Sequence, residues 1–204
     1  MLCLILVGCG ASEVEKVDDP NDTLVTYEPD TTGMIPLESF SEVRDRRVAS
    51  GDTVAISHKI LQKCITGEID GYILESDQAT TFTTQNFTFS EASKVFYNQE
   101  EDFIEVVAGD YVANPDFIEV QLRRFNLAQD VEIQGVTDRK LPLTTVGEAG
   151  QFFAWGSYNP VKQLALVNVG VNYRYIISIS MTGATGIPDK ETIEKWLILS
   201  ELPG

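Results

Sequence analysis

Hydrophobic residues recur along this chain at two spacings, and each spacing predicts a different kind of secondary structure. Alternation of apolar and polar residues is typical of strands with one buried face. It predicts strands over residues 71–75, 80–89, 103–107, 131–136, 151–155, 163–169 and 173–181. Apolar residues three or four positions apart are typical of helices. They predict helices over residues 39–47, 52–66, 90–96, 115–127 and 189–199.

Short-range signals mark where two of these helices begin. Asn114-Pro115-Asp116 places a capping side chain, a proline and an acidic residue in the order that favours a first helical turn. Asp189 is expected to cap the last helix, with Glu191 in its first turn. The turn between the last two strands is expected around Gly170, and residues 142–150 are expected to form a loop.

The order of these helices and strands predicts an α+β fold. A run of strands near the end of the chain favours a single antiparallel sheet with helices packed against it. The order resembles that of PsbP-like domains, which are small secreted or lumenal accessory domains that also occur in bacterial lipoproteins. The segments that carry the resemblance are residues 103–110, 152–155, 164–169, 175–180 and 189–199. The resemblance implies a PsbP-like arrangement and an accessory role, but a fold alone does not imply a reaction.

The first eleven residues, MLCLILVGCGA, form the longest apolar run in the sequence. A run of this length is too short to span a bilayer, and its abrupt end at small residues is typical of a secretion signal. Leu6-Val7-Gly8-Cys9 resembles the lipobox of bacterial lipoproteins. The resemblance implies that residues 1–8 are a signal peptide and that Cys9 carries the lipid after cleavage. Two acyl chains, such as palmitate, would anchor the protein stably where one would be marginal.

The segment that follows is strongly acidic. Residues 10–33 hold seven acidic residues against Lys16 alone, a net charge of 1 − 7 = −6, and two prolines interrupt the segment. Such a segment cannot bury enough apolar surface to offset the entropy lost on ordering. The sequence therefore predicts a signal peptide over 1–8, a lipidated cysteine and flexible tether over 9–33, and one globular domain over 34–204.

Charge and composition exclude some classes of partner. The chain has 15 Lys and Arg against 31 Asp and Glu, which gives a net charge of −16. A field of that sign repels phosphate backbones, so nucleic-acid binding is not expected. The single histidine excludes a metal site built on several histidines. The expected partner is a membrane, reached through the lipid on Cys9, while a protein partner or small ligand is not specified by the sequence.

No set of residues in the sequence predicts catalysis, and no catalytic, cofactor or metal site is assigned. A helix that opens at Asp52 or Thr53 would place His58 beside its apolar face and Cys64 on a different one, so a Cys–His pair is unsupported. Cys64 is expected to be buried. Acidic runs such as Glu100-Glu101-Asp102 lack the spacing of a calcium-binding EF-hand loop and are expected to be solvated.

One predicted strand carries aromatic residues on both of its faces. Phe152-Phe153-Ala154-Trp155 alternates in such a way that neither face of the sheet is polar at this point. Either helices cover both faces, or one face carries an exposed patch that binds a ligand.

Together these features predict a lipid-anchored accessory or binding domain of a bacterial cell envelope, on its periplasmic or surface side. Two other functions stay open. One is an envelope hydrolase that uses carboxylates, and the other is a structural subunit of an envelope assembly. A concave pocket with convergent carboxylates would favour the hydrolase, and a flat apolar patch would favour the assembly.

Overall fold

The computed structural model describes residues 34–84, 88–128, 131–133, 135–141 and 152–203. These residues form one sheet of eight antiparallel strands, in the spatial order β1-β2-β3-β8-β7-β6-β5-β4. The strands are β1 (Ile73–Thr83), β2 (Thr88–Tyr97), β3 (Phe103–Asp110), β4 (Val131–Ile133), β5 (Val136–Lys140), β6 (Phe152–Asn159), β7 (Leu164–Val171) and β8 (Tyr175–Met181). The helices are α1 (Leu37–Ser50), α2 (His58–Lys63), α3 (Pro115–Leu127) and α4 (Lys190–Trp196), with a 3₁₀ turn at Leu199–Glu201. The predicted α+β class with a single antiparallel sheet is confirmed.

Two antiparallel runs of strands join in the middle of the sheet. Strands β1 to β3 form one run and β4 to β8 form the other, and β3 pairs with β8 from Ile104↔Met181 to Asp110↔Tyr175. Helix α3 lies between the two runs in sequence. Because β3 ends where the antiparallel β8 begins, Asp110 and Tyr175 lie side by side at one end of these two strands.

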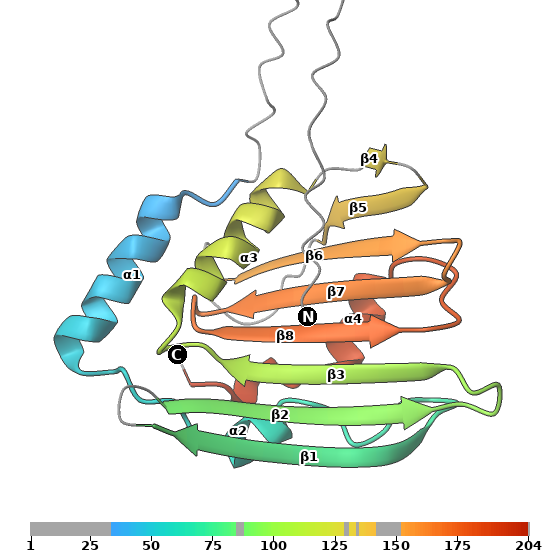
Figure 1. The fold of residues 1–204 in the computed structure, drawn as a ribbon, viewed down its shortest axis with the longest axis horizontal. Helices are drawn as coiled ribbons and strands as arrows, with labels where there is room; N and C mark the ends of the chain where they lie inside the picture. The colour runs from blue at the N-terminus through green and yellow to red at the C-terminus, as the bar shows by residue number, and fades with distance from the viewer. Residues whose placement is uncertain (1–33, 85–87, 129–130, 134, 142–151, 204) are drawn as a thin grey trace, which may run out of the picture. The chain divides into compact units, whose positions relative to one another are not determined.

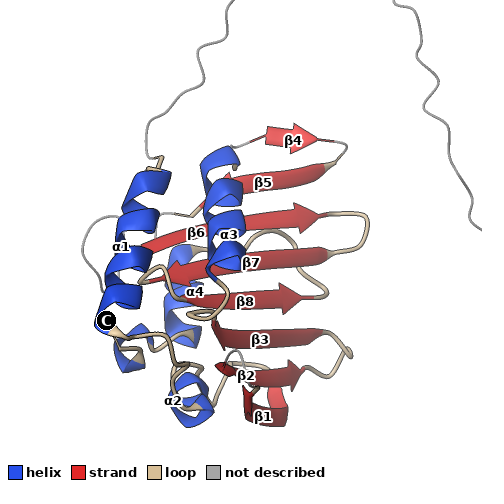
Figure 2. Ribbon diagram, turned by 60° about the vertical axis from the view of Figure 1, so that its left-hand side comes forward, coloured by secondary structure: helices blue, strands red, loops and turns tan. Residues whose placement is uncertain are grey.

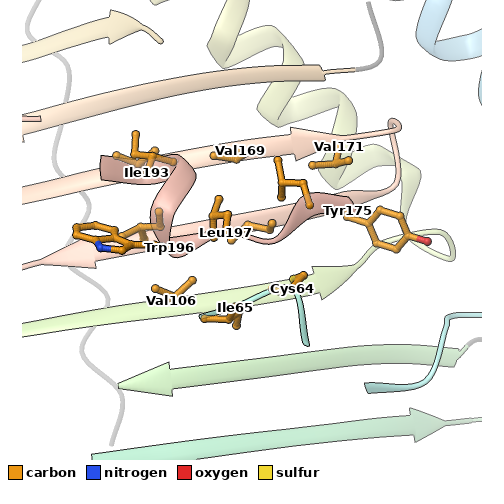
Figure 3. Close-up of a cluster of buried hydrophobic side chains, with 14 of the residues drawn as sticks. Cys64, Ile65, Val106, Val169, Val171, Tyr175, Ile193, Trp196 and Leu197 are labelled. Atoms are coloured by element: carbon orange, nitrogen blue, oxygen red, sulfur yellow. The ribbon is translucent and has the colours of Figure 1, made fainter. Parts of the chain in front are cut away.

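Helices cover both faces of the sheet. Helices α1 and α3 pack on one face, while α2, α4 and the 3₁₀ turn pack on the other (Figures 1 and 2). Alternation along β8 divides its side chains between the two layers: Tyr175 and Ile177 face the α2/α4 layer, and Ile176 faces the α1/α3 layer. Figure 3 shows the larger cluster, in which Trp196 from α4 lies against the sheet.

The aromatic strand β6 follows the same alternation. Phe153 is buried in the α1/α3 layer and Trp155 packs against that layer, whereas Ala154 belongs to the opposite core. The structure therefore agrees with the first of the two alternatives at this strand, in which helices cover both faces.

The prediction of a helix over residues 90–96 was wrong, because this segment is the middle of β2. Its residues alternate in burial, with Ala92 and Phe96 fully buried, and it pairs with β1 on one side and β3 on the other. Pairing with a strand on each side gives these residues backbone hydrogen-bond partners within the sheet. This long-range pairing overrides the local helical signal of Ser90-Glu91-Ala92.

The expected helix over 52–66 was also wrong in its start. Gly51 ends α1 instead of opening a new helix, since its positive φ of 77° lets the Asp52 N–H reach the Arg47 carbonyl. Asp52 caps nothing. Helix α2 begins only at His58, after Ser57, whose side chain accepts a hydrogen bond from the Lys59 N–H.

Other strand boundaries differ from the predicted ones. The expected strands over 71–75 and 80–89 become one long strand β1 and the beginning of β2. The expected strand over 131–136 is two strands, β4 and β5, that meet at Gly135 with a φ of 79°. The hairpin turn lies at Asn172 and Tyr173, not at Gly170, which stays inside β7 because the Phe153 ring fills the space above it.

Both predicted helix starts are confirmed. Helix α3 begins at Pro115, although the Asn114 side chain makes no capping hydrogen bond. Helix α4 is capped by Asp189, whose carboxylate accepts a 2.8 Å hydrogen bond from the Thr192 N–H. The expected loop at 142–150, the lipobox-like segment and the tether lie outside the described residues.

Candidate functional site

A buried arginine organises the end of the sheet where β3 stops and β8 starts. Arg174 is 3% exposed, and it lies directly after the β7–β8 turn. Its Nε and Nη2 donate to the carboxylate of Asp110 at 2.8–3.1 Å. Its Nη1 donates to Asp52 at 2.7 and 2.9 Å, and its Nη2 also donates to the Val54 carbonyl at 2.9 Å. One guanidinium thus holds the end of β3 and the loop after α1 in place.

The carboxylate of Asp110 is fully used by this network. Asp110 is 0% exposed, and besides Arg174 it accepts hydrogen bonds from the Ile56 N–H at 2.8 Å and the Val112 N–H at 3.0 Å. Burial disfavours the charge on Arg174, but hydrogen bonding and attraction from Asp110 outweigh that effect and raise the pKa of Arg174. The Arg174–Asp110 pair therefore has a structural role, and the hydrogen bonds to both Asp110 oxygens leave that carboxylate unavailable as a general base.

A second arginine, Arg47, extends the network toward solvent. It comes from the last turn of α1 and donates to the backbone carbonyls of Asn172 and Tyr173 in the β7–β8 turn. Its Nε lies 3.6 Å from Asp52, whereas Arg174 reaches the same carboxylate at 2.7 Å. Burial and repulsion from Arg174 lower the pKa of Arg47. The Asp52 carboxylate is therefore shared by two arginines, and it neutralises the charge of Arg47 less completely than that of Arg174.

Tyr173 occupies an unusual backbone position beside these arginines. Its φ is +48°, and Asn172 before it has a φ of +53°, a conformation that glycine usually supplies in such turns. Its ring packs edge-on against Phe40 with centroids 6.0 Å apart. Tyr173 is 5% exposed, and its buried hydroxyl has no hydrogen-bond partner among the described residues. Strained positions of this kind gather at functional sites.

These elements enclose a cleft of about 290 Å³, here called the hairpin cleft. Helix α1, the loop after it, the segment between β3 and α3, and the β7–β8 turn all contribute to its walls. The lining residues are Phe40, Arg44, Arg47, Val48, Asp52, Thr53, Tyr111, Val112, Ala113, Pro115 and Tyr173. Its walls are mainly apolar, and its charged groups lie on α1 and at Asp52. The hairpin cleft is therefore of the size and composition of a site for a small molecule.

His58 takes part in a chain of hydroxyl groups next to the network. Its Nδ1 lies 2.9 Å from the Thr81 hydroxyl, which lies 2.8 Å from the Ser90 hydroxyl. Ser90 donates to the Ile56 carbonyl, so Thr81 donates to Ser90 and His58 donates to Thr81. The last hydroxyl proton is thus held by a backbone carbonyl. The chain ties α2 and its preceding loop to the sheet, and it does not activate a nucleophile.

Cys64 lies in the core, as predicted, and is separate from His58. It is fully buried in the α2/α4 layer, where burial raises the pKa of its thiol to about 12. The charge that opposes this shift comes from Lys94 on β2, and not from Lys63, the nearest cation in the sequence. Lys94 is itself buried and donates to the Ile65 and Thr66 carbonyls at 2.9 and 3.3 Å. A thiol held protonated in this way is not a nucleophile at neutral pH.

The acidic runs do not converge on a metal site in the described part of the chain. Among the described residues, no group of three or more His, Cys, Asp or Glu side chains is arranged to hold a metal ion. In the run at 100–102, Asp102 accepts a hydrogen bond from Asn98 and packs against Gly183.

Sequence reasoning missed the residues that build this site. In the alternating pattern of residues 173–181, Arg174 falls at a polar position, which predicts a solvent-exposed side chain. Asp110 follows an apolar strand, which marks only the end of that strand. The signal that could have revealed them is a lone charge at the end of each of two apolar strands. Their separation of 64 residues hides the pairing.

The fold and site define an α+β domain with one antiparallel sheet between two layers of helices and a small-molecule-sized cleft at the ends of its strands. No protein-family model matches the chain, and neither a curated protein nor a solved structure is significantly similar to it. Among the described residues, no helix is both long and apolar enough to cross a membrane.

Proposed function

We propose that this protein is a lipid-anchored accessory or binding domain of a bacterial cell envelope, and that it binds its ligand without catalysis. The observation that carries the binding function is the hairpin cleft, an open cavity with a rigid wall. The Arg174–Asp110–Asp52 network fixes that wall, and its groups are occupied by one another. A preorganised cavity without an activated nucleophile supports recognition in preference to turnover.

The anchor is proposed from the sequence alone. Leu6-Val7-Gly8-Cys9, followed by an acidic segment with two prolines, supports a signal peptide over 1–8, a lipid on Cys9 and a tether over 9–33. Lipid on Cys9 would hold the protein to a membrane at the periplasmic or surface side.

We also propose a PsbP-like arrangement for the domain. The support is the order of its elements, with α3 between two runs of strands, a final run β6-β7-β8 and a closing helix α4. One expected helix of that order, at 90–96, is a strand instead.

The test of the anchor is metabolic labelling with an alkyne fatty acid in the native host. Wild-type protein is expected to incorporate the label and fractionate with membranes, and Cys9→Ser is expected to lose both properties. Cys3→Ser is the matched control, because this cysteine lies in the predicted signal peptide and should not affect the mature protein. Unlabelled wild-type protein, or label retained in Cys9→Ser, would contradict the proposal.

A specific observation supports the structural-subunit alternative. Strand β1 is an edge of the sheet, and it leaves Ile73 and Phe82 exposed by 74% and 57%. Edge strands with exposed apolar side chains favour pairing with another chain. If this alternative holds, Phe82→Thr should shift the protein to lower mass on native gels of membrane extracts, whereas Val161→Thr, at an exposed turn, should not.

At the hairpin cleft the hydrolase alternative has no comparable support. Asp52, which lines the cleft, is bound by Arg174, as is the buried Asp110, so neither is placed to protonate a leaving group or activate water.

A further inference from the structure

The hairpin cleft is lined by apolar side chains and by two arginines. Phe40, Val48 and the Tyr111 ring contribute to its walls, and Tyr111 stacks on Phe117 with ring centroids 4.3 Å apart, which holds that wall rigid. The two guanidinium groups that line it come from successive turns of α1, at Arg44 and Arg47. A ligand that fills the cleft would therefore meet aromatic and aliphatic groups together with the two arginines of α1.

Neither arginine is fully compensated by the protein. Arg47 has only 15% of its side chain exposed, yet its hydrogen bonds go to two neutral carbonyls, and its one nearby carboxylate belongs more closely to Arg174. Within the described part of the chain, Arg44 pairs only with its neighbour Asp45, whose side chain is 69% exposed. An exposed pair of this kind contributes little and is easily exchanged for another anion.

Two further features favour an anion at this place. Tyr173 lines the cleft, and its hydroxyl is a buried hydrogen-bond donor that has no partner among the described residues. Helix α3 begins at Pro115, which lines the cleft, so the positive end of the helix dipole lies beside it. Asp116 in its first turn is exposed and does not line the cleft.

We propose that the hairpin cleft binds a small organic anion, a carboxylate on an aromatic or branched apolar body. The volume of about 290 Å³ limits the ligand to the small end of the usual range. The Asp52 carboxylate also lines the cleft, but it is committed to Arg174 at 2.7 and 2.9 Å. A cationic ligand would instead be repelled by the positive charges of Arg44 and Arg47. The inference rests on the proposed function as a binding domain and specifies its ligand class.

The experiment uses the purified full-length chain and three probes of one shape: benzoate, benzamide and benzylamine, which are anionic, neutral and cationic at pH 7. Binding is followed by chemical-shift changes in two-dimensional NMR spectra. Benzoate is expected to bind with a Kd in the low millimolar range or tighter and to shift resonances of α1 and of the β7–β8 turn. Benzamide is expected to bind at least about tenfold more weakly, and benzylamine not at all, because charged hydrogen bonds supply the difference.

Variants then locate the site. Arg44→Gln and Tyr173→Phe are each expected to weaken benzoate binding by about fivefold, since the first removes a positive charge and the second removes a hydroxyl donor. Arg46→Gln is the matched control: it lies on the same helix but is exposed and does not line the cleft, so its Kd should stay within about twofold. Unfolding curves for each variant separate loss of binding from loss of fold.

Three results would overturn the inference. They are no benzoate binding at 20 mM, equal binding of benzoate and benzamide, or equal effects of Arg44→Gln and Arg46→Gln. These results are independent of the fatty-acid labelling at Cys9. If labelling fails but benzoate still binds, the proposed anchor is wrong and the proposed ligand class stands. If labelling succeeds but benzoate does not bind, the ligand class is wrong and the proposed anchor stands.

Discussion

Replacing Arg174 by methionine removes the cation from the Arg174–Asp110 pair while keeping a side chain of similar length. Asp110 is 0% exposed, so the substitution leaves a carboxylate buried with only the N–H groups of Ile56 and Val112 as donors. Removing one member of a buried ion pair costs about 3–5 kcal/mol, mostly because the remaining charge is uncompensated. We therefore expect Arg174→Met to lower the free energy of unfolding by about 4 kcal/mol.

Urea unfolding measures this loss directly through the fluorescence of Trp155 and Trp196. With a denaturant slope of roughly 2 kcal/mol per molar urea, the midpoint should fall by about 2 M. Two comparisons show the cause. Asp52→Asn should cost only about 1 kcal/mol, because the Asp52 side chain is 39% exposed and asparagine still accepts a hydrogen bond. The double variant Arg174→Met/Asp110→Asn should recover part of the loss, because it removes the uncompensated charge.

The reasoning fails if Arg174→Met costs less than about 1 kcal/mol, since the pair would then be a minor surface interaction. It also fails if the double variant is as unstable as the two single losses added together. Additive losses would mean that Arg174 and Asp110 act independently, contrary to their shared hydrogen bonds.

Three further predictions concern single side chains. Burial raises the pKa of Cys64 from about 9 to about 12, so as pH rises the unfolded chain loses the thiol proton first. The stability that Cys64 contributes below pH 9 should therefore be lost as pH rises toward 12, and the difference in unfolding free energy between wild type and Cys64→Ala across that range measures this loss. Rapid reaction of the native thiol with iodoacetamide at pH 7.5 would contradict the prediction. The hydrogen bond from the Thr192 N–H lowers the pKa of Asp189, so this cap should stabilise the protein at neutral pH and lose its effect as pH falls through the lowered pKa. Asp189→Ala should lower the melting temperature at pH 7, by an amount that shrinks as pH falls below the ordinary carboxylate range, with Asp189→Asn as the control that keeps an acceptor. His58→Ala removes one partly exposed hydrogen bond to Thr81. It should lower the free energy of unfolding in urea by about 0.5–1 kcal/mol and leave benzoate binding unchanged. Loss of benzoate binding in a folded His58→Ala protein would show that the hydroxyl chain has a functional role.

Short-range signals were sufficient for the elements whose ends depend on neighbouring residues. Pro115 has a fixed φ suited to a first helical turn, and α3 begins there. Asp189 reaches an N–H only three residues away, and α4 begins after it. The alternation in β3, β7 and β8 was equally readable, because the burial of one sheet face requires a period of two. The α+β class followed from the order of such elements.

Signals of the same kind failed where long-range contacts decide the backbone. Residues 90–96 have a local sequence that suits a helix start, but pairing with both β1 and β3 makes them a strand. The residues after Gly51 were predicted to open a helix, but Gly51 instead ends α1. Gly170 was a plausible turn residue, but it is needed inside β7 to make room for the Phe153 ring, and the turn is formed instead by Asn172 and Tyr173.

By itself, the sequence determined the class of fold, the starts of α3 and α4, the burial of Cys64 and the net charge of −16. Only the tertiary structure decided the site. Arg174, Asp110 and Asp52 are separated by 64 and 122 residues along the chain, and they meet because β3 and β8 pair in the middle of the sheet while α1 returns to the same edge. Local patterns report interactions within a few residues, whereas a buried charge network is stabilised by partners that only the fold brings within 3 Å.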